Sequence, residues 1–355
     1  MATPPKKNFI PRTMGQVVKK KKTGAGTFVR IVAPIIIPAV ILGASLFSIP
    51  SIIASDVETE QMAVNASSNP FPISVNPSKK LIVESPTADA LLKDGQSGKL
   101  SAAAWGAKEV FVWVANVITS FPAYRFLSAN DIQFVVIKPG YRQEEVAQSF
   151  ARVLGWNSGQ QKQFLRQLHT QAPTLTEGEF VPGTYEVHGA MSTTDVQNLL
   201  AERFANQILA RYTDETALQV PLRDALTIAS MIERETGGTD DMRMISGIIW
   251  NRLFTNMHLQ IDATLQYAKA DTTKSWWPPV VPKDKYISSK YNTYAHGGLP
   301  PGPIASPSVA AVIAALNPKP TDCVFYFHDS RGEFHCSPDY KGHVRLLKQY
   351  YGQGK

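Results

Sequence analysis

A glutamate lies inside the apolar face of a predicted helix in the second half of the chain. Pro221 suits the first turn of this helix, and Gly237-Gly238 suits its end. With about 100° of rotation per residue, Glu233 falls within the apolar arc and Glu235 at its edge. Burial disfavours the charged form of a carboxyl group, so its pKa rises and it keeps its proton. Such a group can act as a general acid.

The same placement also has a structural interpretation. Buried charges are nearly always paired, so Glu233 could form an ion pair with Arg243, Arg252 or another base. Helix geometry alone favours this alternative, because most buried charges are structural.

Residues that suit a sugar substrate follow this helix and a second predicted helix over 241–253. Gln260 and Asp262 flank Ile261, and in an extended segment this spacing puts both polar side chains on one face. Trp276-Trp277 could form a groove wall or a core plug. A Gly- and Pro-rich loop then combines aromatic faces with an amide and a hydroxyl group, in Tyr291, Asn292, Thr293 and Tyr294. The loop could bind sugar or could merely be rigid.

The chain contains two cysteines, Cys323 and Cys336. The sequence between them predicts strand, turn and strand. A hairpin centred on Asp329-Ser330 would place the two cysteines opposite each other, within reach of a disulfide. The sequence leaves open whether they are bridged.

Three histidines close to this hairpin make a zinc site conceivable: His328, His335 and His343. No pair of potential ligands has a recognised spacing such as CxxC or HExxH. We therefore favour scattered polar residues on a hairpin, and we predict no metal and no cofactor.

The N-terminal part of the chain is basic and then apolar. Residues 1–55 contain eight Lys or Arg and no acidic residue, and residues 31–54 carry no charge. A spanning helix needs roughly 20 apolar residues, and basic residues favour the cytoplasmic side. We therefore predict a cytoplasmic tail over 1–30, a single transmembrane helix over 31–54 and an extracytoplasmic body. The alternative is a cleaved signal peptide.

The formal net charge of +7 comes from this tail. The chain has 36 Lys and Arg, of which 28 remain outside residues 1–55, against 29 Asp and Glu. A nucleic-acid-binding body needs a basic excess, so this class of function is excluded.

The predicted fold class is α+β. Residues 55–130 are predicted as a spacer and accessory segment whose apolar helix, over 101–121, could pack on the body or lie on the bilayer surface; we favour packing. Residues 131–210 predict a small βα module, with a strand at 132–137 and a short strand pair in EFVPGTYEV. It could serve packing or glycan binding. Residues 211–355 are predicted as a mixed α/β domain.

Three long motifs, in this order, resemble the YceG-like family of membrane-anchored endolytic murein transglycosylases: IASMIERETG, IIWNRLFTNMHLQIDATLQYA and YNTYAHGGLPPGPIASPSVAAVIAALNP. EGEFVPGTYEV resembles the family's segment before the catalytic helix, with Gly183 where Asp is usual. IQFVVIKPGYRQEEVAQSFARVL resembles its LysM-like subdomain. Residues 56–130 and the region 269–290 depart from the family pattern.

The resemblance implies cleavage of the MurNAc–GlcNAc β-1,4 bond of nascent peptidoglycan strands without water. The products would carry 1,6-anhydro-MurNAc ends, which would terminate strand elongation. The matching catalytic residue is Glu233, with Glu235 as runner-up. The substrate-binding residues would be Gln260, Asp262, Tyr291, Asn292, Thr293 and Tyr294. Glycan strands, the membrane and cell-wall synthases are the implied partners.

Two alternatives stay open. The chain could be a non-catalytic peptidoglycan-binding scaffold of cell-wall synthesis. It could also be a muramidase that uses water, with Asp262 or Glu235 as the second carboxylate that hydrolysis requires.

Overall fold

The structure, a computed structural model, describes residues 48–58, 69–94, 102–121, 124, 132–237, 241–270 and 275–352. The chain divides into two units, Met1–Ser48 and Ile49–Lys355, and every described residue except Ser48 belongs to the second unit. The predicted basic tail and most of the predicted transmembrane segment therefore lie outside the described residues. None of the described helices is both long enough and apolar enough to cross a membrane.

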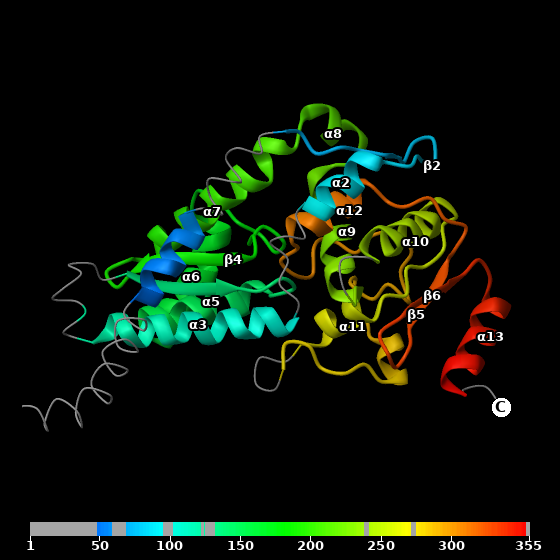
Figure 1. Ribbon diagram of the computed structural model, residues 1–355. Coiled ribbons are helices and arrows are strands. Elements are labelled where there is room, and N and C mark those ends of the chain that lie inside the picture. Colours follow the sequence, from blue (N-terminus) through cyan, green and yellow to red (C-terminus); the bar gives the residue numbers. More distant parts are fainter. Residues whose placement is uncertain are drawn as a thin grey trace, which may run out of the picture. The chain divides into compact units, whose positions relative to one another are not determined.

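A two-stranded antiparallel sheet lies at the centre of the module over residues 132–207 (Figure 1). β3 (Ile132–Ile137) pairs with β4 (Gly183–His188) along its whole length. The strand predicted at 132–137 is confirmed. The strand pair predicted in EFVPGTYEV is wrong, because this segment forms one strand whose hydrogen bonds go to β3.

Apolar side chains on both faces of β3 are buried. Phe134 and Val136 contact α3 (Ala102–Ser120) on one face of the sheet. Val135 and Ile137 point to the opposite face, as alternation along a strand requires. The helices that cover this second face are α5 (Gln143–Leu154), α6 (Ser158–Thr170) and α7 (Thr193–Gln207). The sheet is thus the middle of three layers.

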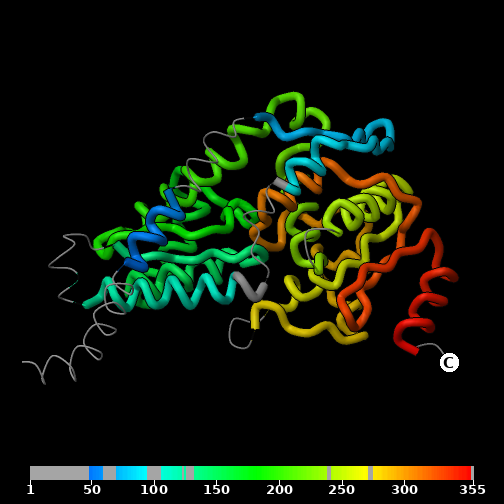
Figure 2. The backbone as a smooth tube through the Cα atoms, in the orientation of Figure 1, coloured from blue at the N-terminus to red at the C-terminus, as the bar shows by residue number. Residues whose placement is uncertain are grey.

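Elements before α3 pack against α12 (Val309–Leu316), a helix far along the chain, as Figure 2 shows by their colours, cyan beside orange. They are β1 (Val75–Asn76), β2 (Leu81–Ile82) and α2 (Pro86–Asp94). The Ser74 N–H donates to the Leu316 carbonyl at 3.0 Å, and the Asn317 amide donates to the Pro72 carbonyl at 2.6 Å. Residues 69–94 were expected to lie in a spacer, but Phe71, Val75, Ala88 and Leu92 of this range are part of the body's core.

The remaining part of the body is mainly helical. Its helices are α8 (Asp214–Gln219), α9 (Leu222–Glu235), α10 (Met242–Phe254), α11 (Asp262–Lys269), α12 (Val309–Leu316) and α13 (Tyr340–Tyr351), with 3-10 turns at Leu209–Arg211 and Pro282–Tyr286. The middle of α9 is buried without interruption from Ala225 to Ile232. Helices with small antiparallel sheets confirm the α+β class, while the domain boundaries stay predictions.

The C-terminal hairpin consists of β5 (Phe325–His328) and β6 (Phe334–Ser337). Tyr326 lies opposite Cys336, so the pairing is centred on Arg331. The predicted centre at Asp329-Ser330 is therefore wrong. A longer loop separates the strands than the sequence pattern indicated.

The Asp329 side chain builds this longer loop. Its Oδ1 accepts the backbone N–H groups of Arg331 at 2.8 Å and Glu333 at 3.1 Å. Cys323 lies before β5 and is nevertheless bridged to Cys336, with the two Cα atoms 5.8 Å apart. The disulfide thus joins the base of the hairpin although its register differs from the predicted one.

Candidate active site

Helix α9 carries both candidate glutamates in its last turn. Pro221, predicted in the first turn, is the N-cap residue directly before the helix, and Thr236, one residue before the predicted end at Gly237, follows its last residue. The buried middle of the helix fixes its position, so its final turn is held at a constant place in the body. Glu233 and Glu235 are both half-buried there.

The Glu233 carboxylate lies at the amino end of α12. Its Oε2 accepts two hydrogen bonds from Ser308, from the backbone N–H at 2.9 Å and from the hydroxyl group at 2.6 Å. Ser308 is also the N-cap of α12, since its Oγ accepts the Ala311 N–H at 3.2 Å. Donors and a helix N-terminus both favour a negative charge. The setting is therefore more polar than the apolar arc predicted.

The two arginines proposed as structural partners of Glu233 bind elsewhere. Arg243 forms ion pairs with Glu84 and Asp89, the first at 2.9 Å. Arg252 donates from Nε to the Val324 carbonyl at 2.7 Å. Neither arginine therefore forms the predicted ion pair with Glu233, while the alternative of pairing with another base stays open.

Glu235 faces the hairpin and the start of α11. Its Oε2 accepts the Tyr326 hydroxyl at 2.9 Å, and its Oε1 accepts the Ala263 N–H at 3.4 Å. Burial raises the pKa of Glu235; the two hydrogen bonds oppose the rise, and the nearby Asp262 carboxylate adds to it. A carboxyl group with a raised pKa thus lies at Glu235, the runner-up, and the raised pKa predicted at Glu233 stays a prediction.

Arg234, between the two glutamates, stacks on Trp277. Its guanidinium carbon lies 3.8 Å from the centre of the ring, and burial lowers the pKa of Arg234. The Trp277 indole N–H donates to Glu145 at 3.0 Å. A Cβ on Gly140 would lie 3.1 Å from Arg234 Cδ, so this turn lies directly against the arginine. Trp277 is half-buried and packs on the arginine between the two glutamates, so it is not a core plug, and its role as a groove wall stays a prediction.

Backbone hydrogen bonds join the βα module to the segment before α12. The Gly140 N–H donates to the Ser306 carbonyl at 2.8 Å, and the Ser306 N–H donates to the Tyr141 carbonyl at 2.6 Å. Ser306 is two residues from Ser308, the partner of Glu233. The module therefore helps to set the position of the Glu233 contacts.

Of the predicted binding residues, Asp262 and Tyr294 contact each other near Glu235. Gln260 and Asp262 are both exposed, but the segment is not extended, because Gln260 has a φ of 50° and Asp262 begins α11. The Asp262 Oδ1 accepts the Tyr294 hydroxyl at 2.7 Å. Asp262, Tyr294 and Glu235 thus surround the start of α11, and their role in binding stays a prediction.

The other predicted binding residues are engaged within the protein. Asn292 and Thr293 are 0% and 1% exposed. The Asn292 amide donates to two backbone carbonyl groups, and the Thr293 hydroxyl accepts the Ile261 N–H at 3.0 Å. Tyr291 packs on Tyr267, with the ring centres 4.7 Å apart. In this conformation these residues hold the loop, while their predicted contacts with sugar are untested.

The model of the YceG-like family matches residues 115–349, more than half of the chain. This range contains the end of α9, all of α12 and the hairpin. The chain belongs to the YceG-like family.

Two curated relatives are named endolytic murein transglycosylase. That of Streptococcus pneumoniae serotype 2 (strain D39) is 26% identical over 246 residues, 61% of this chain and 44% of the relative. That of Bacillus subtilis (strain 168) is 31% identical over 175 residues, 49% of this chain and 48% of the relative. The chain thus spans about half the length of the curated relatives it matches.

A crystal structure of a YceG-like protein from Listeria monocytogenes has a similar fold. The TM-score is 0.53 and the sequence identity 26%, over 60% of this chain and 75% of that one. Family membership thus rests on sequence and on fold.

One departure from the YceG-like pattern has a structural explanation. Gly183 stands where the family resemblance expects Asp. A Cβ at this position would lie 2.1 Å from Arg203 Nη2, so the arginine occupies the space of the side chain. Arg203 donates to the Thr184 carbonyl at 2.8 Å and lies over the Tyr185 ring. Any larger residue at 183 would require Arg203 to move.

Glu177, the first residue of the EGEFVPGTYEV motif, is a further buried carboxyl group that was not among the predicted site residues. Its side chain is buried, its Oε1 accepts the Gln143 N–H at 3.1 Å, and its Oε2 has no hydrogen-bond partner among the described residues. Burial, and then the nearby Glu144, raise the pKa of Glu177 well above its ordinary value. The next residue, Gly178, would clash with Pro303 if it carried a Cβ. In the sequence, only the EGEFVPGTYEV motif indicated this contact between the βα module and the segment before α12.

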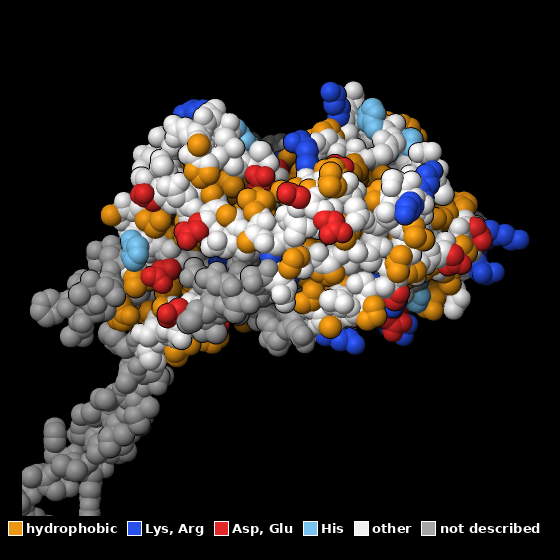
Figure 3. Space-filling model, turned by 90° about the horizontal axis from the view of Figure 1, so that it is seen from above, with side chains coloured by type: hydrophobic (Ala, Val, Ile, Leu, Met, Phe, Trp, Pro, Cys, Tyr) orange, Lys and Arg blue, Asp and Glu red, His pale blue; other side chains and the backbone are white. Residues whose placement is uncertain are grey.

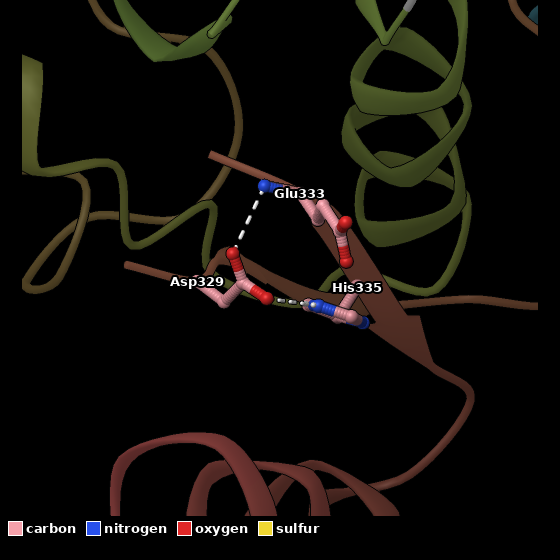
Figure 4. A group of neighbouring side chains, drawn as sticks. All are labelled: Asp329, Glu333 and His335. Carbon is pink, nitrogen blue, oxygen red and sulfur yellow. Dashed lines mark hydrogen bonds and ion pairs between the residues drawn. The ribbon is translucent and has the colours of Figure 1, made fainter. Parts of the chain in front are cut away.

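A second carboxylate cluster lies at the tip of the hairpin (Figure 4). Potential ligand atoms of Asp329, Glu333 and His335 lie within 4.8 Å of one another. Arg331 lies against both carboxylates, at 3.2 Å from Asp329 and 2.7 Å from Glu333. A cation would have to displace this guanidinium group, so the cluster is better explained as a set of contacts that fixes the loop conformation.

The three histidines considered for zinc make separate contacts. His328 lies 2.5 Å from Asp241, and His335 lies 3.1 Å from Asp329. His343 stacks on Phe325, with the ring centres 5.4 Å apart. These contacts give no support to a three-histidine site in the described part of the chain.

Proposed function

We propose that this chain is an endolytic peptidoglycan transglycosylase that cuts the MurNAc–GlcNAc β-1,4 bond and leaves 1,6-anhydro-MurNAc ends. The observation that carries the proposal is the Glu233 carboxylate, held by Ser308 at the amino end of α12. This contact joins two of the motifs on which the family resemblance rests. The names of the two curated relatives support the same activity.

In the proposed reaction Glu233 is first an acid and then a base. Its proton moves to the glycosidic oxygen as the bond from this oxygen to C1 of MurNAc breaks. The sugar passes through an oxocarbenium-like state. The carboxylate then takes the proton of the C6 hydroxyl group as the C6 oxygen bonds to C1. Glu233 ends protonated, as it began, and no water is consumed.

The contacts of Glu233 suit the charged intermediate of this cycle. When the acid gives up its proton, negative charge develops on the carboxylate. The two Ser308 donors and the α12 N-terminus stand where this charge forms. Donors that are already in place stabilise developing charge without reorganisation. The Ser308 contact would therefore promote the step in which the glycosidic bond breaks.

The alternative is a muramidase that uses water, with Glu235 or Asp262 as the second carboxylate. Hydrolysis with two carboxylates requires one that activates water or attacks the sugar. Glu235 accepts hydrogen bonds from Tyr326 and Ala263, and Asp262 accepts one from Tyr294.

We further propose that the body lies outside the cytoplasm and is anchored by the uncharged stretch 31–54, whose last residues pack beside α3, with residues 1–30 in the cytoplasm. The uncharged stretch and the eight basic residues near it support this topology. Glycan strands at the membrane surface would be the substrate, and cell-wall synthases would be neighbouring partners.

The product decides between the two reactions. The full chain in detergent is incubated with purified murein sacculi in water enriched in oxygen-18, and the fragments are analysed by mass spectrometry. Transglycosylation predicts 1,6-anhydro-MurNAc ends without the heavy isotope, which are absent with the Glu233→Gln variant. Reducing ends that carry oxygen-18 would support the muramidase. Binding without any cleavage would support the scaffold.

A further inference from the structure

Helix α3 presents an apolar face to solvent. Its inner face carries Val112, Ala115 and Ile118, which are buried. The outer face and the residue after the helix carry large, exposed hydrophobic side chains. Their exposed fractions are 61% for Val110, 58% for Phe111, 66% for Trp113, 37% for Val117 and 58% for Phe121. Large contiguous apolar surfaces usually mark an interaction site.

This outer face carries no charged residue. The charged residues of α3 are Lys108 and Glu109, and both are used in contacts with the body. Lys108 Nζ lies 3.5 Å from Asp56, and Glu109 lies 2.7 Å from Lys138 Nζ. By contrast, the face drawn in Figure 3 mixes apolar, acidic and basic side chains. A helix that is apolar both inward and outward is unusual for a surface facing only water.

The end of the uncharged stretch 31–54 packs beside α3. Residues 48–58 are helical, and their Ile53 and Val57 share one buried cluster with Val112 and Ala115. Ile52, on the same short helix, is 63% exposed. The chain therefore comes from the predicted anchor directly to the flank of α3.

We propose that the outer face of α3 lies on the outer surface of the phospholipid bilayer, with Trp113 and its apolar neighbours among the headgroups and upper acyl chains. The inference rests on the proposed membrane anchor and not on the proposed reaction. Lipid fits better than a protein partner, because the face offers no charged group to set a register, and aromatic side chains favour the membrane interface.

Such contact would orient the candidate active site relative to the membrane. The Asn116 side chain is hydrogen-bonded to both the N–H and the carbonyl group of Phe134, each at 2.8 Å, so α3 cannot rotate on β3 without breaking both bonds. Glu109 lies 3.5 Å from the Tyr141 hydroxyl, and the Tyr141 carbonyl accepts the Ser306 N–H. A short series of contacts thus links α3 to the segment that binds Glu233.

Spin labels can measure the depth of this face in the bilayer. Both native cysteines are in the disulfide, so one added cysteine gives one label. The full chain is placed in nanodiscs of phosphatidylethanolamine and phosphatidylglycerol with a label at Val110→Cys or Trp113→Cys. The control is Leu218→Cys on α8, where the native side chain is 88% exposed. A label at Val40→Cys reports separately on the anchor.

We expect several-fold higher ratios of oxygen to nickel-complex collisions at 110 and 113 than at 218. Labels at 110 and 113 that behave like 218, while position 40 is in the bilayer, would overturn the inference and leave the anchor intact. If position 40 is also in water, the anchor fails and the inference with it. Spin–spin broadening at 113 would also overturn it, by showing contact with a second copy of the chain.

Discussion

Two carboxylates beside the same hairpin, the buried Asp329 and the half-buried Glu235, have opposite electrostatic settings. Asp329 is 7% exposed, and although burial acts to raise its pKa, hydrogen bonds from His335, Arg331 and Glu333 lower it below its ordinary value. Glu235 at the end of α9 accepts hydrogen bonds from Tyr326 and Ala263, and burial raises its pKa despite them. The difference lies in the number of donors and in the charge of Arg331.

This comparison shows why burial alone does not identify a catalytic carboxylate. Asp329 has donors on both oxygens and a guanidinium group beside it, which suits a fixed charge that shapes a loop. The last turn of α9 combines Glu233, which has Ser308 as a donor, with Glu235, whose pKa is raised.

Removing the disulfide is expected to have the largest effect on stability and little effect on chemistry. The cysteines are 13 residues apart, and a loop of about this length contributes roughly 3 kcal/mol. The Cys323→Ser/Cys336→Ser variant should therefore lose about that much free energy of unfolding, measured by denaturant titration. Its rate on murein, well below the melting temperature, should stay within about twofold, since no catalytic group is lost. A rate loss without a stability loss would place the hairpin in the site.

Replacing Ser308 should slow the reaction. Ser308→Ala removes the hydroxyl donor to Glu233 and keeps the backbone N–H. A hydrogen bond to a charged group is worth about 1.5–3 kcal/mol, which corresponds to roughly 10- to 100-fold in rate. Initial rates of anhydro-end formation check this expectation.

Ser192→Ala is the matched control for the Ser308 variant. Ser192 caps α7 by accepting the Asp195 N–H at 3.2 Å, and it has no contact with α9. Both variants should lose about 1 kcal/mol of stability through the missing cap. Equal rates in the two variants would show that Ser308 acts only through helix stability.

Neutralising Glu235 and neutralising Asp329 should change the melting temperature in opposite directions at neutral to alkaline pH. The folded-state pKa of Glu235 is raised, so its stabilising contribution is full below about pH 4.3 and is lost as pH rises through the folded-state pKa. Glu235→Gln should therefore melt a few degrees above the parent at pH 8, and the difference should disappear near pH 4. A lower melting temperature at pH 8 would contradict the raised pKa.

Asp329→Asn should show the reverse. The pKa of Asp329 is lowered, so its contribution is full above about pH 3.9 and is lost as pH falls through the folded-state pKa. The variant should melt below the parent at pH 7, with the difference shrinking under acid conditions. Calorimetry over a pH series measures the melting temperatures of both variants. An unchanged melting temperature of Asp329→Asn at pH 7 would contradict the role of Asp329 in fixing the loop.

The smallest effect is expected from Tyr326→Phe. Its hydroxyl group donates to Glu235 and favours the charged form. Without it the pKa of Glu235 should rise further, which NMR titration of the labelled carboxyl carbon can follow. An unchanged titration midpoint would show that the hydrogen bond is not formed in solution.

Elements with a strong periodic pattern could be predicted from the sequence. The buried run of α9 between Pro221 and Gly237, the strand at 132–137 and the helices of the βα module follow from local pattern and punctuation. The bridge between Cys323 and Cys336 was a possibility that the structure confirms. These features depend on residues close together in the chain.

Contacts between distant segments could not be predicted in the same way. Glu233 and Ser308 are 75 residues apart in the sequence. Helical periodicity cannot predict that the start of α12 lies beside the end of α9. The buried state of Asn292 and Thr293 depends on carbonyl groups that only the folded loop brings near. The hairpin register was missed because the Asp329 side chain, rather than a turn motif, sets the loop length.

The most direct test of the account is a comparison of Glu233→Gln with Glu235→Gln on purified murein. Folding of each variant is confirmed by its melting temperature. The account predicts that Glu233→Gln lowers the rate of anhydro-end formation by about 10²- to 10⁴-fold, the usual contribution of a general acid–base, whereas Glu235→Gln retains more than about a tenth of the rate, because its role there is structural. The reverse order would move catalysis to Glu235 and contradict the account.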